Sequence, residues 1–421
     1  MNPASRHRGT LALLLAALSM IGPFSIDTMF PGFPGMARDF AASPLAMQQT
    51  VSVYLLAYAL MSVVHGPVSD AYGRRPVIVA GMLGYALASV GTALAPTLEM
   101  LLAWRAVQGV CAGAGIVVGR AVIRDLFEGA EAQRLMSQVT MIFGIAPAIA
   151  PVVGAQLVLM SGWRGIFWAL ALFAALLVAG TLAWLPESHP PGNRMPLRPR
   201  PLLAGWRHIL GDRGFWPLAA SGTLNFGALF LYIASAPAVV LDLLALSPQA
   251  FPWLFGPIIG GIMSGSWLSS RLAGRYTASV TVNLAYALML VGVVLNFVLT
   301  LLFSAQPPAW SLLSLYFSGA GVGLALPTLT LLLLDRFPRQ RGGVSSMQAF
   351  ISLLFNALLA GALSPLLSGS LRVMAVGAGV ITLGGWLSWR GFARIAAAEV
   401  AAQSCVDVAA VVVERPPTES G

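Results

Sequence analysis

The sequence has little charge and no lysine at all. Asp, Glu, Lys and Arg together make up only 9% of its 421 residues, whereas about a quarter is usual for a soluble domain. All 24 basic residues are arginine, which excludes chemistry that needs a lysine amine, such as a P-loop ATPase or a Schiff-base enzyme. This number of charged residues is too small to cover the surface of a soluble protein. The composition therefore predicts a chain that lies mostly in lipid.

Cysteine is scarce, and the basic residues form no patch. The two cysteines, Cys111 and Cys405, lie in an apolar run and in the C-terminal tail, which argues against a disulfide framework and a metal site. The formal charge of +9 would suit nucleic acid only if the arginines shared one surface, but they stand in gaps between apolar runs. The spans contain no H-E-x-x-H, no G-x-S-x-G and no carboxylate pair. We therefore expect no nucleic-acid partner, metal, cofactor or enzyme activity.

Long apolar runs dominate the rest of the sequence. A helix needs about 20 apolar residues to cross ~30 Å of hydrocarbon, and the mean hydropathy of +0.81 reflects twelve such runs. The first run is too long for a signal peptide and lacks a small-residue cleavage site, so we interpret it as a retained helix. The runs cover residues 10–31, 47–68, 77–96, 99–123, 135–159, 164–185, 215–240, 250–271, 280–304, 309–334, 343–368 and 372–396.

The arginines predict the orientation of these helices. With the N-terminus in the cytoplasm, most arginines fall inside, and only Arg38, Arg164 and Arg372 fall outside. This bias is the positive-inside rule of multi-pass membrane proteins. We therefore predict both termini in the cytoplasm, and the composition favours a bacterial cytoplasmic membrane.

The longest gap divides the chain into two halves. Residues 186–213 are rich in proline and arginine and predict a cytoplasmic linker. It separates an N-terminal half, 1–185, from a C-terminal half, 214–397, and residues 398–421 predict a disordered cytoplasmic tail. The expected fold class is an all-α membrane protein of twelve transmembrane helices in two six-helix halves, the layout of a secondary transporter built from repeats.

A motif in the loop after the second helix resembles a known family. The segment GPVSDAYGRRP, which begins at Gly66, is similar to the G-x-x-x-D-x-x-G-R-[RK] signature of the major facilitator superfamily. Gly66 and Gly73 permit close backbone approach and a tight turn, while Asp70, Arg74 and Arg75 form a charge cluster. We interpret the cluster as a latch of the inner gate. A loop that only fixes orientation is the alternative.

Further stretches narrow the resemblance to the Bcr/CflA drug-resistance transporters. IDTMFPGFPGM (26–36), WRAVQGVCAGAGIVVGRAVIRDLFEG (104–129), IAPAIAPVVGA (145–155) and GWRGIFW (162–168) are similar to patterns of that family. The resemblance is dense in the N-terminal half and weaker in the C-terminal half. It implies the major facilitator fold and proton-coupled export of small amphipathic compounds, whose identity the motifs leave open.

Asp27 and Arg105 are the candidate groups for proton coupling. By the predicted boundaries, Asp27 is the one carboxylate away from the end of a span, and Arg105 enters the fourth helix at a similar depth. The resemblance places both helices at the central cavity. Burial disfavours an ionised carboxylate and a nearby arginine favours it. We therefore expect Asp27 to take a proton from outside and release it inside, with a cationic or polar substrate competing for the same carboxylate. The alternatives are a wetted Asp27 at the outer interface and an Arg105 that anchors its helix through backbone carbonyls.

Further candidates lie at the inner end of the fourth helix and beside Gly66. Arg124 is placed to pair with Asp70, and Arg120 lies one helical turn before Arg124. Asp125 is placed to pair with Arg74 or Arg75. His65 is either a titratable gate residue or an ordinary interfacial histidine.

Small residues and prolines predict the shape of helices four and five. Glycines at helical spacing permit close helix packing or leave cavity volume; in the fourth helix they are Gly109, Gly113, Gly115 and Gly119. The antiporter-like motif of the fifth helix predicts a bend; its residues are Gly144, Pro147, Pro151 and Gly154.

Aromatic residues and one asparagine are candidates for the cavity wall, with packing or lipid contact as the alternative. They are Phe24, Tyr54, Tyr58, Asn225, Phe226, Phe230 and Phe317. The expected partners are the lipid bilayer, a small-molecule substrate and protons, and we expect a monomer. The alternative function is a proton-coupled importer or facilitator of a small nutrient, in which Asp27 would bind the substrate.

Overall fold

The computed structural model describes residues 8–127, 129–194, 199–272, 275–303, 308–338 and 340–413. Within these residues the regular structure is entirely helical. Ten helical stretches among them are long and apolar enough to cross a membrane. The predicted fold class, an all-α multi-pass membrane protein, is confirmed.

The N-terminal half contains the first seven α-helices. They are α1 (Arg8–Asp27), α2 (Phe33–Asp39), α3 (Pro44–Tyr72), α4 (Arg74–Ala93), α5 (Leu98–Gly113), α6 (Gly119–Leu126) and α7 (Gly129–Trp184). A 3-10 turn, η2 (Phe30–Gly32), joins α1 to α2, and a π-helical turn, η3 (Ala114–Val118), joins α5 to α6. Gly162, with φ of 68°, breaks α7 into two helices, which match the predicted fifth and sixth spans.

The C-terminal half repeats this layout. The helix α8 (Pro199–Gly211) lies in the linker that precedes this half. The helices of the half itself are α9 (Phe215–Ala234), α10 (Pro252–Leu272), α11 (Ala278–Leu302), α12 (Leu315–Arg336), α13 (Arg341–Leu358), α14 (Ser364–Leu367) and α15 (Leu371–Val413). Short turns extend three of them: η5 (Ala238–Leu243), η7 (Ala309–Ser314) and η8 (Leu359–Leu363).

Helix α10 shows why apolar character alone undercounts the spans. It has 21 residues but is not among the ten apolar stretches, because glycines and serines dilute its hydropathy. Those small residues form its packing face: a Cβ atom at Gly265 would lie 2.0 Å from the Ala320 carbonyl oxygen of α12. Small residues that let two backbones approach are typical of membrane helix interfaces.

Two boundaries differ from the predicted ones. The first span continues past Pro31 to Asp39, because Pro31 and Pro34 occupy first-turn positions of η2 and α2, where a missing N–H costs little. At the other end, α15 runs to Val413, so residues 398–413 are helical where we expected a disordered tail. That stretch is rich in alanine and has no proline before Pro416; residues 414–421 lie outside the described part.

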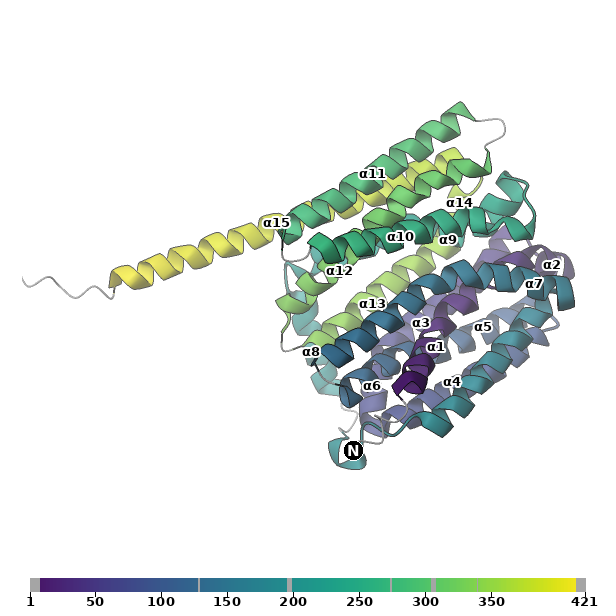
Figure 1. The fold of residues 1–421 in the computed structure, drawn as a ribbon, viewed down its shortest axis with the longest axis horizontal. Coiled ribbons are helices and arrows are strands. Elements are labelled where there is room, and N and C mark those ends of the chain that lie inside the picture. Colours follow the sequence, from purple (N-terminus) through teal and green to yellow (C-terminus); the bar gives the residue numbers. More distant parts are fainter. Residues whose placement is uncertain are drawn as a thin grey trace, which may run out of the picture.

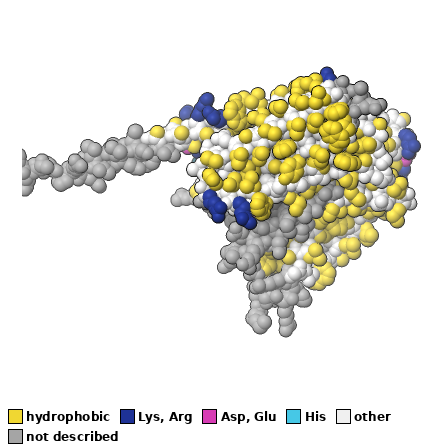
Figure 2. Space-filling view, turned by 45° about the horizontal axis from the view of Figure 1, so that its top comes forward, with side chains coloured by type: hydrophobic (Ala, Val, Ile, Leu, Met, Phe, Trp, Pro, Cys, Tyr) yellow, Lys and Arg dark blue, Asp and Glu magenta, His cyan; other side chains and the backbone are white. Residues whose placement is uncertain are grey.

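The helices run side by side, and the two halves meet along α3 and α13 (Figure 1). The end of the bundle at which α2 and α14 lie is called the α2 end here. The opposite end, at which α8 lies and α4 and α13 begin, is called the arginine-rich end. Hydrophobic side chains cover the face seen in Figure 2, and arginines gather near its edges. This is the surface of a bundle whose middle lies in lipid.

Candidate functional site

Asp27 is buried deep within the first span. It is the last residue of α1 and only 3% exposed, and its Oδ1 atom has no hydrogen-bond partner among the described residues. At 1.5 Å per residue it lies roughly 18 Å from the end of α2 and roughly 28 Å from the start of α1. The position does not fit the alternative of a wetted carboxylate at the outer interface, because α2 extends the span beyond it.

The backbone around Asp27 is packed tightly by α7 and α4. A Cβ atom at Gly154 of α7 would lie only 2.0 Å from the Thr28 carbonyl oxygen. On the other side, the hydroxyls of Ser25 and Tyr85 form a hydrogen bond between α1 and α4. Gly154, which the sequence assigned to a helix-bending motif, therefore provides close contact with the residue after Asp27.

The rest of that motif lies in α7 as expected. Pro147 and Pro151 are inside the helix, whose backbone leaves helical geometry only at Gly162. The surroundings of Gly144 lie outside the described part of the chain. The predicted bend of the fifth helix stays a prediction.

Arg105 is a fully buried cation held by neutral groups. It is 0% exposed. Its Nε donates to the Thr50 carbonyl oxygen at 3.0 Å, its Nη1 donates to Gln108 Oε1 at 2.8 Å, and its guanidinium lies 4.4 Å from the centre of the Tyr54 ring. Gln108 Nε2 in turn donates to Ser89 Oγ at 2.7 Å. Nη2 has no partner among the described residues, so one donor of this cation is free.

No ion pair joins Asp27 to Arg105 within the described residues. The carboxylate and the guanidinium lie in the same half, but each has neutral surroundings. Sequence reasoning missed the partners of Arg105. One signal for them was present, because Gln108 follows Arg105 by three residues and so shares its helix face.

Arg74 is the centre of the charge cluster at the arginine-rich end. It lies 2.5 Å from Asp70 Oδ1 and 3.0 Å from Asp125 Oδ2, and it also donates to Ser69 Oγ at 2.5 Å. Asp70 therefore pairs with Arg74 and not, as we expected, with Arg124. Arg124 is exposed and forms no ion pair in the described part of the chain. The cluster ties together the ends of three helices of one half.

Glu187 is a further member that the sequence did not reveal. Its two carboxylate oxygens accept from the backbone N–H groups of Arg74 and Arg75 at 3.0 and 3.3 Å, so it caps the N-terminus of α4. The turn that precedes α4 needs glycine, because Gly73 has φ of 102°. Arg75 donates to the Leu182 carbonyl oxygen.

Two other residues of the predicted gate are less engaged. A Cβ atom at Gly66 would meet nothing within 4 Å, so the close approach expected there does not occur in this conformation. Arg120 is exposed at the arginine-rich end.

The candidate cavity residues separate into two groups. Phe24, Tyr58 and Phe226 are half-buried, whereas Tyr54 and Phe230 are buried. Tyr54 packs on Arg105, so its ring serves the buried cation.

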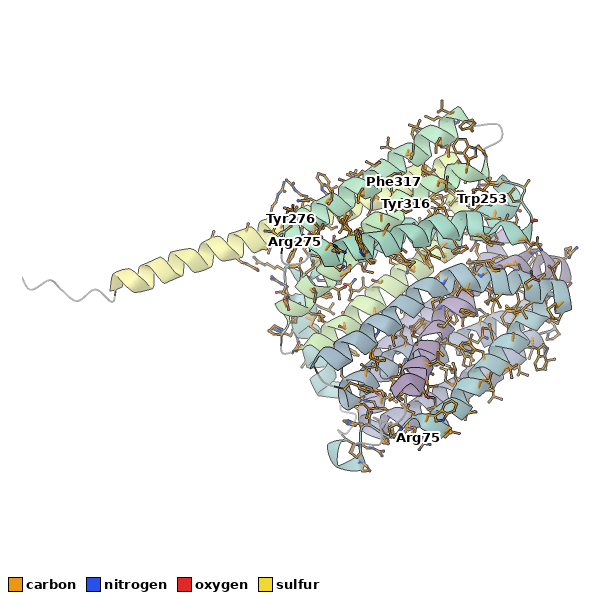
Figure 3. All side chains as sticks on the ribbon, in the orientation of Figure 1. Arg75, Trp253, Arg275, Tyr276, Tyr316 and Phe317 are labelled. Carbon is orange, nitrogen blue, oxygen red and sulfur yellow. The ribbon has the colours of Figure 1, made fainter. Side chains whose placement is uncertain are left out.

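Asn225 and Phe317 contact neighbours within the C-terminal half. Asn225 donates from Nδ2 to Met289 Sδ at 3.2 Å, while its Oδ1 has no partner among the described residues. Phe317 packs on Tyr316, with ring centres 5.7 Å apart, and Figure 3 shows both far from α1.

Three hydrogen bonds join the two halves near the α2 end. Gln48 Nε2 donates to the Ala234 carbonyl oxygen at 3.1 Å. Gln49 Nε2 donates to the Gly361 carbonyl oxygen at 2.9 Å, and Ser52 Oγ donates to that of Ala357 at 2.8 Å. All three donors lie in the first three turns of α3. We call these bonds the α3 seal, and they tie the two halves together at the α2 end.

Residues 13–365 match the family described as Major Facilitator Superfamily. The chain belongs to this family. Its members are transporters rather than enzymes, and the resemblance inferred from the motifs is confirmed.

Curated relatives and solved structures agree with the family. The chain is 30% identical to the "Uncharacterized MFS-type transporter YdgK" of Bacillus subtilis, over 85% of this chain and 89% of the relative. It is 29% identical to the "Multidrug resistance protein MdtM" of Escherichia coli K12, over 77% of this chain and 79% of the relative. Its fold resembles that of the D-xylose-proton symporter, with a TM-score of 0.69 at 15% identity, over 90% of this chain and 97% of that one.

Proposed function

We propose that this protein is a proton-coupled antiporter that exports small amphipathic compounds across a bacterial cytoplasmic membrane. The observation that carries the proposal is the Asp27 carboxyl, which is 3% exposed and has an unpartnered oxygen inside a membrane span. Ionisable groups inside membrane spans are costly and mark ion or substrate pathways. The relatives named as multidrug resistance proteins support the export of drug-like compounds.

The arginine-rich end faces the cytoplasm in this proposal, and both termini are cytoplasmic. The positive-inside bias of the arginines supports this orientation. The α3 seal then closes the outer side, so the structure corresponds to a state that exchanges substrate with the cytoplasm. Residues 1–185 and 214–397 act as the two units that rock about the site, with 186–213 as the connection between them.

Competition between proton and substrate for Asp27 couples the two fluxes. In the state closed to the outside, Asp27 releases its proton to the cytoplasm and a cationic or polar substrate takes its place. After the halves rock, the carboxylate takes a proton from the outside and the substrate leaves. A ligand drives such a change only through its different affinity for the two states. A change in the hydration of Asp27, or in its distance from Arg105, when the halves rock would provide that difference.

Arg105 acts on Asp27 without touching it. A fixed cation in a low-dielectric half favours the ionised carboxylate at a distance. Its hydrogen bonds to Thr50 and Gln108 keep it in place while the proton moves. The Arg74 cluster acts as the latch at the inner mouth, because its partners come from the ends of α3, α4 and α6.

A neutral polar substrate is the second candidate. In the C-terminal half, the buried amide oxygens of Asn225, Gln348 and Asn356 have no hydrogen-bond partner among the residues that the structure describes. Such groups are costly when unpaired and would accept hydrogen bonds from a hydroxyl-rich nutrient. In that function the protein would be a proton-coupled importer or a facilitator, and Asp27 would bind the substrate.

The test measures proton release from inverted vesicles with an acidic interior. We expect cationic and neutral amphipathic antibiotics to dissipate the pH gradient in the wild type, and Asp27→Asn to abolish the response. Asp39→Asn is the matched control, because Asp39 lies on the same span but at its exposed end. Undiminished proton release by Asp27→Asn would contradict the proposal. Uptake of a sugar with no response to any antibiotic would favour the importer.

A further inference from the structure

A stripe of polar side chains runs along one face of α3. Tyr54, Tyr58, Ser62, His65 and Ser69 follow one another at spacings of four, four, three and four residues, which align them on one side of a helix. The stripe begins beside the buried Arg105, on which Tyr54 packs. It therefore extends from the depth of the proposed coupling site toward the arginine-rich end.

Glycines of α5 let the stripe contact the fourth span directly. A Cβ atom at Gly109 would lie 2.2 Å from the Tyr54 carbonyl oxygen. A Cβ atom at Gly113 would lie 2.8 Å from His65 Nδ1 and 3.0 Å from the Tyr58 ring. Gly113 is thus the place where the imidazole and the phenol both contact α5. The π-helical turn η3 begins at the next residue, and such turns are frequent at functional sites.

His65 is the titratable member of the stripe near neutral pH. It is 5% exposed, and its Nδ1 is a buried atom that meets no full hydrogen-bond geometry among the described residues, although the backbone of Met61 and Val110 lies beside the ring. A buried polar atom without a partner is costly and calls for an explanation. Histidine is the side chain whose charge changes most readily between about pH 5 and 8.

Few other titratable groups face His65 from the neighbouring elements. On α5, the thiol of Cys111 points instead toward Gly84 of α4, where a Cβ atom would lie 2.8 Å from it. On α4, the Tyr85 hydroxyl is bonded to Ser25. The turns η3 and η8 and residues 342–358 of α13 contain no titratable side chain. The groups left along this face are Tyr58 toward the core, Arg120 of α6, whose charge acts on Tyr58, and the Arg74 cluster toward the arginine-rich end.

The lower end of the stripe connects to the charge cluster. Ser69, one turn below His65, accepts a hydrogen bond from Arg74 Nη1 at 2.5 Å. Arg74 in turn pairs with Asp70 and Asp125. The stripe therefore joins the buried cation of the coupling site to the latch along a single helix.

We propose that His65 is a proton-binding site on the exit path, which receives the transported proton and passes it to the cytoplasmic side. This inference rests on the proposed proton antiport. The proton leaves the Asp27 carboxyl, crosses water beside the half-buried Tyr58, and binds His65 Nδ1 to give an imidazolium. The imidazolium then loses the proton on Nε2 to water at the inner mouth, and exchange between the two ring tautomers restores the starting form.

The experiment compares His65→Gln with the wild type in proteoliposomes, with Asp27→Asn and His208→Gln as references. His208 is exposed on α8 and outside the transport path, so it is the matched histidine control. We expect substrate-triggered proton flux in His65→Gln to be slower by ~10-fold or more, with substrate affinity unchanged. We also expect its dependence on cytoplasmic-side pH to flatten between about 5.5 and 7.5.

The outcomes separate the two proposals. If the wild type shows no substrate-triggered proton flux, the proposed antiport fails. If the flux is lost in Asp27→Asn but His65→Gln keeps the wild-type rate and pH profile, only the role of His65 is wrong.

A second measurement covers the case in which His65→Gln misfolds. Nitrogen-15 NMR of a variant in which His7, His189 and His208 are all replaced by glutamine would follow the protonation of His65 directly, because His65 is then the only histidine of the chain. We expect the His65 signal to change from the neutral to the protonated form as the pH falls from about 8 to about 5.5. A signal that stays neutral over that range overturns the proposal.

Discussion

The two halves of the bundle bury different kinds of polar group. In the part of the chain that the structure describes, the buried charged side chains are Asp27, Arg74 and Arg105, all in the N-terminal half. The buried polar residues of the C-terminal half are serine, threonine and asparagine, such as Ser221, Asn225 and Asn296, and all are neutral. A repeat fold shared by both halves therefore supports two different chemistries.

This difference assigns different tasks to the halves. A charge within the bilayer costs roughly 2.5–3.5 kcal/mol even by insertion scales, so the N-terminal half bears a cost that the C-terminal half avoids. Charges respond to protons, whereas neutral amides and hydroxyls read the shape and hydrogen bonding of a ligand. We infer that the N-terminal half couples the protons and that the C-terminal half contributes recognition.

The largest expected effect is the difference in proton-coupled transport between the variants Arg105→Leu and Asn225→Leu. Loss of the buried cation should lower proton-coupled transport by ~100-fold, because no fixed charge then favours the ionised carboxylate of Asp27. Asn225→Leu should leave the proton response within about threefold but change the preference among substrates by roughly 10-fold. Vesicle proton release with a panel of compounds measures both. Loss of the proton response in Asn225→Leu would contradict the assignment of proton coupling to the N-terminal half.

The charge clusters at the arginine-rich end allow a second test. Both halves place an arginine between two carboxylates: Arg74 between Asp70 and Asp125, and Arg336 between Asp212 and Glu399. The Arg74 side chain is 9% exposed and that of Arg336 17%.

Because Arg74 is the more buried arginine, its loss should cost more stability. We expect Arg74→Gln to lower it by about 3 kcal/mol and Arg336→Gln by about 1.5 kcal/mol, since hydrogen bonds to charged groups contribute in this range. Thermal unfolding in detergent measures the loss of stability in each variant. Equal losses in the two variants would contradict this prediction.

Two glycines give opposite expectations. Gly73→Ala forces a Cβ atom onto a backbone with φ of 102° and to 2.6 Å from Glu187 Oε2, so we expect a loss of about 2 kcal/mol. Gly342, in α13 of the other half, has open space around it, and Gly342→Ala should stabilise by about 0.5 kcal/mol. The midpoint of thermal unfolding measures the change in stability of each variant. Stabilisation by Gly73→Ala would show that the turn tolerates a side chain.

The smallest effect concerns acid stability. Burial alone would raise the pKa of Asp212, but the hydrogen bonds and charge of Arg336 lower it below its usual value. The stabilisation is therefore present above the unfolded pKa of about 4 and is lost as the pH falls through the folded pKa. Thermal unfolding between about pH 7 and 3 should show a decline that Asp212→Asn reduces. An identical decline in the variant would exclude Asp212 as its source.

Local signals predicted most of the fold and part of the site. Apolar runs predicted the spans, and the spacing of Asp70, Gly73 and Arg74 predicted the charge cluster, because both depend on neighbours in sequence. The partners Glu187 and Ser89 could not be predicted, since each comes from an element distant in the chain. Pro31 misled the boundary of the first span because proline is tolerated in a first helical turn.

The α3 seal has a consequence for sequence variation. Its donors are side chains of Gln48, Gln49 and Ser52, but its acceptors are backbone carbonyls. Substitutions at Ala234 or Ala357 cannot delete an acceptor that every residue carries. The side-chain part of the α3 seal is thus encoded on one helix, so three codons decide whether these bonds form, whereas the facing positions can change residue type without losing the acceptor.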